Sequence, residues 1–180
     1  LVQNVSTAAA IGRAVTRGVP LYERVVTLAG SIVRHPGNYR VRLGTTLGDL
    51  LEAAGGLKAP AVKVVAGGPM MGVCQPDLAA PIVKASSGFV FLSRDEARDQ
   101  APFPCIRCSR CISVCPMGLD PTGLARRVER GDLEGAEELH LHDCIECASC
   151  SYICPSNRWL VQQIRLGKAK LNERKQNSVG

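Results

Sequence analysis

The chain has 180 residues, of which 46% are hydrophobic, 21% charged and 4% aromatic, and its formal net charge is +6. This length can bury one medium core or two small ones, and the few aromatic residues argue against the stacking surfaces of nucleic-acid binders. The longest uncharged stretch, from Val64 to Pro76, has 13 residues, whereas a membrane-spanning helix needs about 20. The composition therefore predicts no transmembrane segment and no nucleic-acid partner.

The first hundred residues predict a small α+β domain. Five stretches rich in β-branched residues are expected to form strands: 24–33, 38–44, 62–68, 81–85 and 88–92. Two helices are expected, residues 4–15 with Ser6 or Thr7 as N-cap and residues 45–56 with Thr45 or Thr46 as N-cap.

A change in composition near residue 100 predicts a domain boundary. The first hundred residues contain one cysteine, Cys74, which is interpreted as a buried apolar thiol, while residues 105–154 contain the other eight. The junction, RDEARDQAPFPC, is charged and then rich in proline. Upstream of it, GGPMMG is interpreted as a turn in which Met70 and Met71 fill gaps.

Two cysteine motifs follow, and each repeats the other. CIRCSRCISVCP starts at Cys105 and CIECASCSYICP starts at Cys144, 39 positions later. Clustered Cys-x-x-Cys pairs are typical of metal ligation in a reducing compartment rather than of disulfides between remote segments. The chain also shows no export signal, so a cytoplasmic location is expected. Between the motifs, two short helices capped by Asp120 and Asp132 are expected, the first with Pro121 at its first position.

Each motif follows the pattern C-x2-C-x2-C-x3-C-P, in which the last cysteine binds the cluster held by the other motif. Two 4Fe-4S clusters are therefore predicted, one bound by Cys105, Cys108, Cys111 and Cys154, the other by Cys144, Cys147, Cys150 and Cys115. Zinc is the alternative, but four-cysteine zinc sites use two separated pairs and would leave the third cysteine of each motif without a role. Since the cysteines supply four ligands per cluster, His140 and His142 are expected to be exposed or packed rather than ligating.

Two such clusters would change the charge balance. Eight thiolates and two inorganic cores of about +2 each add about −4, which leaves a holoprotein near +2. The first motif carries Arg107 and Arg110, whereas Asp143 and Glu146 lie at the second. Because positive charge stabilises the reduced form, the cluster of the first motif is predicted to have the higher potential.

The last residues predict a basic helix. An apolar stripe of Leu160, Val161, Ile164 and Leu171 would pack on the domain. The basic face suits an acidic ferredoxin, the loop of a membrane partner or anionic lipid. The alternative is a solvated helix end that frays into a disordered terminus.

The pair of motifs resembles bacterial two-cluster ferredoxins, and GGPMMG, CPMGLDPTGL and CIECASCSYICPSN resemble the C subunit of Rnf-type electron transport complexes. That family joins a flavin- and NADH-binding domain to a small β-grasp domain and a two-cluster ferredoxin domain. The resemblance implies an α+β chain, with a small β-grasp domain followed by a bacterial two-cluster ferredoxin-like α-helical domain. The implied segments are a remnant of the upstream flavin/NADH domain (1–20), a soluble-ligand-binding β-grasp or SLBB domain (21–100), the ferredoxin-like domain (101–170) and a basic tail (171–180).

The resemblance also implies a function, namely electron transfer through two 4Fe-4S clusters in a membrane-associated NADH:ferredoxin oxidoreductase. The partners would be the other redox subunits and ferredoxin, and the chain would lie peripherally on the cytoplasmic side of the inner membrane. FMN and NADH would bind only in the upstream domain, so this chain alone would lack their active site, and no catalytic residue is assigned. Two alternatives stay open: a cobalamin-reductase-type electron-transfer subunit, and a ligand- or partner-binding module whose clusters are structural.

Overall fold

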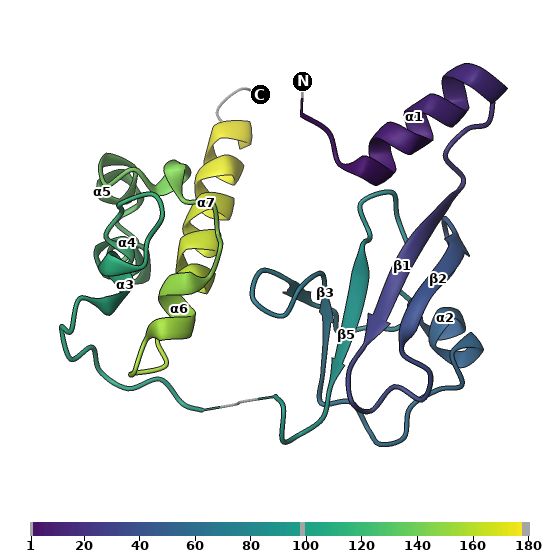
Figure 1. Ribbon diagram of the computed structural model, residues 1–180. Helices are drawn as coiled ribbons and strands as arrows, with labels where there is room; N and C mark the ends of the chain where they lie inside the picture. The colour runs from purple at the N-terminus through teal and green to yellow at the C-terminus, as the bar shows by residue number, and fades with distance from the viewer. Residues whose placement is uncertain (1, 98–99, 178–180) are drawn as a thin grey trace. The chain divides into compact units, whose positions relative to one another are not determined.

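The computed structural model describes residues 2–97 and 100–177, whose helices and strands are shown in Figure 1. The chain divides into two compact units, Leu1–Arg98 and Asp99–Gly180. All strands of the described residues lie in the first unit, and the second unit is helical. The predicted α+β fold class is confirmed by this combination of a mixed sheet and helices.

The first unit starts with α1 (Val5–Arg17), none of whose residues is buried. Its N-cap is Asn4, whose side-chain oxygen accepts a hydrogen bond from the Ser6 backbone N–H at 2.9 Å. The predicted caps Ser6 and Thr7 are wrong because both residues already belong to the helix. Asn is as favourable an N-cap as Ser, and the helix begins directly after Asn4.

A mixed sheet forms the centre of the first unit. Its strands are β1 (Glu23–Ala29), β2 (Gly37–Arg42), β3 (Lys63–Ala66), β4 (Val73–Cys74) and β5 (Gly88–Leu92). Their order is β2-β1-β5-β3-β4, in which β1 and β5 are parallel neighbours and the other pairs are antiparallel. With α2 (Leu47–Ala53) packed on this sheet, the arrangement is that of a β-grasp domain.

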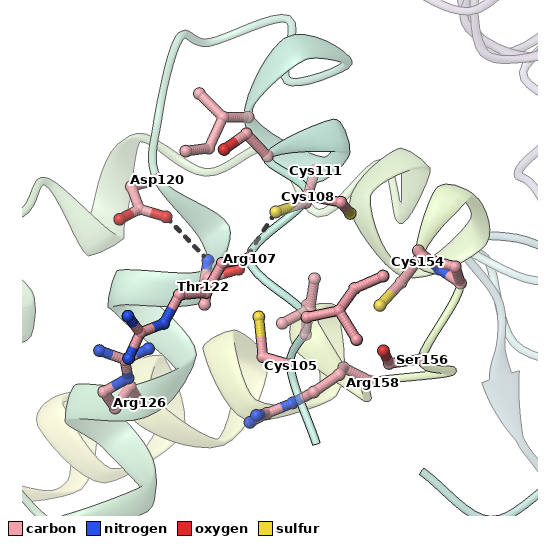
Figure 2. A pocket seen from close by; sticks show the side chains of 15 residues that line it. Cys105, Arg107, Cys108, Cys111, Asp120, Thr122, Arg126, Cys154, Ser156 and Arg158 are labelled. Atoms are coloured by element: carbon pink, nitrogen blue, oxygen red, sulfur yellow. Dashed lines mark hydrogen bonds between the residues drawn. The ribbon is translucent and has the colours of Figure 1, made fainter. Parts of the chain in front are cut away.

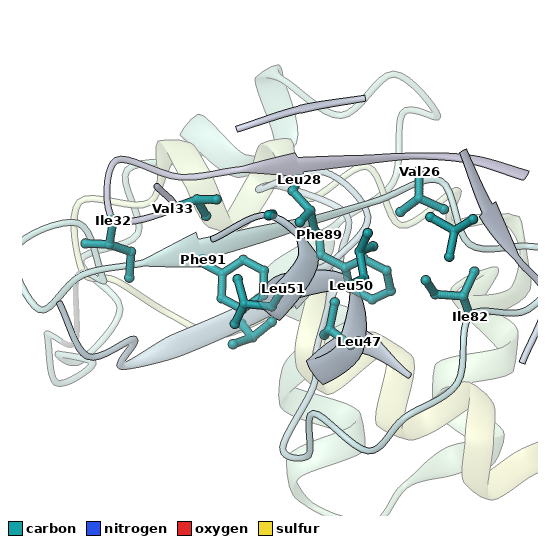
Figure 3. Packing of buried hydrophobic residues seen from close by; sticks show 13 residues of the cluster. Val26, Leu28, Ile32, Val33, Leu47, Leu50, Leu51, Ile82, Phe89 and Phe91 are labelled. Atoms are coloured by element: carbon teal, nitrogen blue, oxygen red, sulfur yellow. The ribbon is translucent and has the colours of Figure 1, made fainter. Parts of the chain in front are cut away.

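The core of the first unit lies between the sheet and α2 (Figure 3). Phe91 of β5 is fully buried there, and three leucines of α2 belong to the same cluster: Leu47, Leu50 and Leu51. Helix α2 begins with a capping box, in which Thr46 Oγ1 accepts from the Asp49 N–H at 3.1 Å and the Asp49 carboxylate accepts from the Thr46 N–H at 3.4 Å. The N-cap is therefore Thr46, one of the two residues, Thr45 and Thr46, that the sequence predicted for this position.

The strand predicted at residues 81–85 is not formed. Only an isolated bridge joins Pro81 to Thr46, and the neighbouring backbone groups bond to the start of α2 instead of to a strand. Ala80 accepts from the Leu47 N–H at 3.1 Å, and the Ile82 N–H donates to the Thr45 carbonyl at 2.8 Å. Proline has no N–H for a sheet ladder, so this segment supports the helix terminus.

The predictions for Cys74 and for the two methionines are wrong as well. Cys74 is exposed because β4 is a two-residue strand at the edge of the sheet. GGPMMG does contain the expected turn, between β3 and β4, but Met70 and Met71 are exposed on it and fill no gap in the core.

The second unit packs short helices against one long helix. Its elements are α3 (Arg110–Ser113), α4 (Pro121–Glu129), α5 (Leu133–Glu138), the 3-10 turn η1 (Leu141–Asp143), α6 (Ser149–Ile153) and α7 (Leu160–Asn177). Asp120 and Asp132 cap α4 and α5 as predicted, and Pro121 occupies the first helical position. The apolar stripe predicted for α7 is also confirmed, since its members are buried: Leu160, Val161, Ile164 and Leu171.

Helices α4 and α7 pack closely because α7 carries a glycine at their contact. A Cβ atom at Gly167 would lie 2.5 Å from Val128 Cγ2 and 3.2 Å from Leu141 Cδ2, so no larger residue fits without movement. Residues 171–177 of the predicted basic tail form the end of α7, where Lys175 pairs with Glu137 at 3.0 Å. Fraying is therefore not seen over 171–177, and the rest of the predicted tail, residues 178–180, lies outside the described residues.

Among the helices of residues 2–97 and 100–177, none combines the length and the apolar character that crossing a bilayer requires.

Candidate metal centres

The repeat in the sequence is also a repeat in the backbone. Arg107 has φ 55° and its equivalent in the second motif, Glu146, has φ 56°. Two positions later, Ser109 and Ala148 have φ 59° and 63°. These left-handed residues fold each loop back on itself, and a short helix then carries the third cysteine of each motif, α3 in the first and α6 in the second.

A first cavity, of about 230 Å³, is lined by one predicted set of four cysteines. Figure 2 shows Cys105, Cys108 and Cys111 of the first motif around it, together with Cys154 from the end of the second motif. Cys154 is far from the other three in sequence. The fold thus brings the last cysteine of one motif to the loop of the other.

A second, narrower cavity, of about 20 Å³, is lined by the other predicted set: Cys144, Cys147, Cys150 and Cys115. The rest of its lining is apolar and comes from α4, α7 and the two motif loops, with members such as Leu124, Val161 and Ile164. All eight motif cysteines are free thiols. They are therefore divided four and four between two separate cavities.

Each of these two sets supplies the four thiolates that bind a 4Fe-4S cluster. In the part of the chain that the structure describes, no group of three or more His, Cys, Asp or Glu side chains converges closely enough to hold one metal ion. A cluster of four irons holds its ligand sulfurs much further apart than one zinc ion does, and its ligands are four thiolates. The assignment of each cysteine to a cluster stays a prediction that this grouping supports.

Polar and basic side chains surround the first cavity. Thr122 Oγ1 lies 3.1 Å from Cys111 Sγ, close enough to donate a hydrogen bond to it. Three arginines line the same cavity, Arg107, Arg126 and Arg158, and Arg158 pairs with Glu129 at 2.6 Å. Hydrogen bonds and positive charge both stabilise a reduced cluster relative to an oxidised one.

Basic side chains also contact the loop of the second motif, which the sequence did not reveal. Glu146 pairs with Arg165 at 2.9 Å and with Lys168 at 3.1 Å, and the Lys168 ammonium also donates to the Cys144 carbonyl at 2.5 Å. Burial by itself would raise the pKa of Glu146, but the hydrogen bonds from Lys168 and Arg165 outweigh it and lower that pKa. Glu146 is therefore compensated, which removes much of the charge contrast on which the predicted difference in potential rests.

The thiol environments of the second motif are unequal. Burial raises the pKa of Cys144, and it raises the pKa of Cys150 to about 11, whereas the hydrogen bond with the Ser149 side chain lowers the pKa of Cys147. Buried thiols of this kind become thiolates when a metal supplies positive charge.

The two histidines do not join either cavity. His140 lies 3.8 Å from Asp143, and His142 lies 3.3 Å from Glu137.

The sequence did not indicate two residues that contact the cysteine loops, Thr122 of α4 and Lys168 of α7. Nothing in the order of residues indicates these contacts, because Lys168 is 24 positions from Cys144.

Comparisons with protein families define the class of protein. Residues 25–73 match the SLBB domain model, and residues 104–159 match the 4Fe-4S dicluster domain model. The second match contains all eight motif cysteines. The chain therefore combines an SLBB domain with an iron–sulfur domain of the two-cluster type.

Curated relatives narrow this class further. Three relatives are C subunits of ion-translocating complexes. The chain is 46% identical over 94% of its length to the C subunit of the proton-translocating ferredoxin:NAD(+) oxidoreductase complex of Clostridium ljungdahlii, of which it covers 37%. It is 38% identical over 95% of its length to the C subunit of the Na(+)-translocating ferredoxin:NAD(+) oxidoreductase complex of Acetobacterium woodii, covering 39% of it. It is 45% identical over 99% of its length to the C subunit of the ion-translocating oxidoreductase complex of Pasteurella multocida, covering 21%.

These 180 residues are thus homologous to one segment of the C subunits of ion-translocating oxidoreductase complexes. The predicted resemblance to Rnf-type C subunits is confirmed. The chain spans roughly two fifths or less of the length of these relatives, since it covers 37%, 39% and 21% of the three.

Proposed function

We propose that this chain relays single electrons through two 4Fe-4S clusters within a membrane-associated ferredoxin:NAD⁺ oxidoreductase complex. The observation that carries the proposal is the division of the eight motif cysteines between two cavities, each completed by the last cysteine of the other motif. The names of the relatives and the dicluster match support the same function.

The chain's own residues would hold and insulate the two redox centres. A cluster with four cysteine ligands has no open coordination position, so it exchanges electrons instead of binding substrate. Cys115 and Cys154 tie the two loops together, which keeps the two sites at a constant separation. The apolar lining from α4 and α7 keeps water from the second site, while Thr122 and Lys168 stabilise added negative charge.

The remaining parts of the activity are assigned by analogy with the relatives. FMN and NADH would bind in parts of a C subunit other than these 180 residues. The other redox subunits of the complex, and ferredoxin, would be the electron-transfer partners. The chain would lie peripherally on the cytoplasmic face of the cell membrane.

The test is an anaerobic measurement of iron, sulfide and zinc, followed by EPR spectroscopy of the dithionite-reduced chain. About eight iron and about eight sulfide per chain are expected, with EPR signals broadened by coupling between two reduced clusters. Stoichiometric zinc without sulfide would contradict the proposal. Clusters that are present but resist reduction would favour the module in which they are structural.

A further inference from the structure

The mouth of the first cavity forms an exposed face of mixed basic and apolar character. We call it the Arg107 face, and its members all line the cavity: Ile106, Arg107, Cys108, Ile112 and Arg126. Ile106 is 67% exposed and Ile112 43%. Cys108 is the one exposed thiol among the eight motif cysteines, and the other seven are buried or half-buried. Cys108 is therefore the motif cysteine with the least protein between it and solvent, so an electron would enter or leave this site there.

The internal repeat shows what is unusual about this face. In the second half, Glu146 and Arg165 form an ion pair at 2.9 Å. The positions 39 residues earlier are Arg107 and Arg126, so the first half carries two cations where the second half carries a cation and an anion. Figure 2 shows both arginines on the same side of the first cavity. The second half therefore contains an ion pair at these two positions, whereas the first half contains two cations that cannot pair with each other.

The carboxylates near the Arg107 face are already engaged. Within the described residues, neither Arg107 nor Arg126 has an ion-pair partner. Asp120 lines the cavity, but its Oδ1 caps α4 by accepting from the Thr122 and Gly123 N–H groups, both at 3.0 Å. Glu129 pairs with Arg158. Arg107 and Arg126 are thus exposed cations without an ion-pair partner among the described residues, and a carboxylate from another molecule would complete the missing pair.

We propose that the Arg107 face docks the acidic surface of a one-electron carrier protein, with its carboxylates on Arg107 and Arg126 and its apolar contact on Ile106 and Ile112. The inference rests on the proposed electron-transfer function and names the surface that serves it. One electron passes from the reduced carrier to the cluster nearest Cys108, which is reduced as the carrier is oxidised, and no bond forms or breaks. Opposite charges at such a contact mainly raise the rate of association.

The test is stopped-flow reduction of the anaerobic, cluster-loaded chain by a reduced, strongly acidic bacterial ferredoxin. Replacing both cations (Arg107→Gln with Arg126→Gln) should lower the second-order rate constant about tenfold at low ionic strength, and the difference should shrink with added salt. Reversing both charges (Arg107→Glu with Arg126→Glu) should invert the salt dependence. A control that removes two exposed cations elsewhere (Arg17→Gln with Lys170→Gln) should stay within about twofold of the unchanged chain.

A small neutral reductant separates docking from effects on the cluster itself. Photoreduced 5-deazariboflavin needs no docking surface, so the Arg107→Gln, Arg126→Gln variant should slow its reaction far less than the reaction with ferredoxin, because only the loss of positive charge beside the cluster remains. Equal slowing with both reductants would overturn the proposal, because the arginines would then serve the cluster and not a partner. A rate with ferredoxin that does not change in the variant would overturn it as well.

Two further readouts distinguish the remaining outcomes. If the variant lost sedimentation with phosphatidylglycerol vesicles but kept its rate with ferredoxin, the face would bind a lipid surface and the proposal would be wrong. Iron and sulfide content, together with reduction of the unchanged chain by deazariboflavin, report on the proposed function alone. If the chain holds no reducible cluster, the proposed electron-transfer function is wrong, whatever the docking experiment would show.

Discussion

The loops at residues 105–115 and 144–154 follow the same backbone course but have different surroundings. Both loops use the same cysteine spacing and the same left-handed residues. Polar side chains and arginines line the first cavity, whereas apolar side chains line the second, and the ion pairs of Glu146 with Arg165 and Lys168 lie beside the second loop. The repeat therefore supplies the same four-cysteine set to each site, while residues of helices α4 and α7 give the two sites different environments.

The largest expected effect comes from the predicted binding of each cluster by three cysteines of one motif and the last cysteine of the other. If Cys115 and Cys147 bind the same cluster, Cys115→Ser with Cys147→Ser should remove one cluster and keep about four iron per chain. Cys154→Ser with Cys147→Ser should damage both clusters and leave little iron. Iron and sulfide assays of anaerobically purified protein measure both variants. The opposite ranking would mean that each motif binds its own last cysteine.

The close packing of α4 on α7 gives the next largest effect. Val128 and Gly167 occupy equivalent positions of the repeat and meet each other, so Gly167→Ala places a methyl group 2.5 Å from Val128 Cγ2. Overpacking of this kind costs about 1–3 kcal/mol, seen as a lower thermal unfolding midpoint of the holoprotein. Gly12→Ala is the control, because a Cβ there meets nothing within 4 Å. An unchanged midpoint for Gly167→Ala would show that α7 moves away freely.

The charge of Lys168 should raise the potential of the second cluster. Its side chain is 17% exposed and its ammonium binds the Cys144 carbonyl. Lys168→Gln should therefore lower that potential, by on the order of 50 mV for one charge nearby at an effective dielectric constant of about 20. An EPR-monitored redox titration measures it, with exposed Lys170→Gln as the control and Lys168→Arg as the variant that keeps the charge. Equal shifts for Lys168→Gln and Lys170→Gln would assign the effect to net charge alone.

The hydrogen bond at the first cavity should give the smallest effect. Thr122→Val removes the hydroxyl that lies 3.1 Å from Cys111 Sγ and nearly keeps the side-chain shape. The potential of the first cluster should fall, by on the order of 20 mV, because hydrogen bonds to sulfur stabilise the reduced state. Ser149→Ala is the matched change at the second cavity, where Ser149 Oγ lies 3.4 Å from Cys147 Sγ. The same titration should show Thr122→Val shifting the first cluster and Ser149→Ala the second.

Local signals were read correctly for three of the four predicted helix caps and failed for α1, where Asn4 and not Ser6 or Thr7 is the cap. The caps Thr46, Asp120 and Asp132 were predicted because a cap bonds to backbone groups two or three residues away. The stripe of α7 was predicted because a helix has a regular period. Predictions failed for residues 81–85 and Cys74, since whether an apolar segment joins a sheet, and whether its side chains are covered, depends on distant residues.

By itself, the sequence determined the class of site and its family, because eight cysteines at a repeated spacing leave few other chemistries open. Only the tertiary structure decided which charges act on each site. Glu146 appeared as an uncompensated acid beside the second motif until α7 brought Arg165 and Lys168 to it. Arg107 and Arg126 appeared as ordinary surface cations until the fold placed both at one cavity. Electrostatic interactions depend on distance in space, and the order of residues does not contain that distance for helices that meet only in the folded chain.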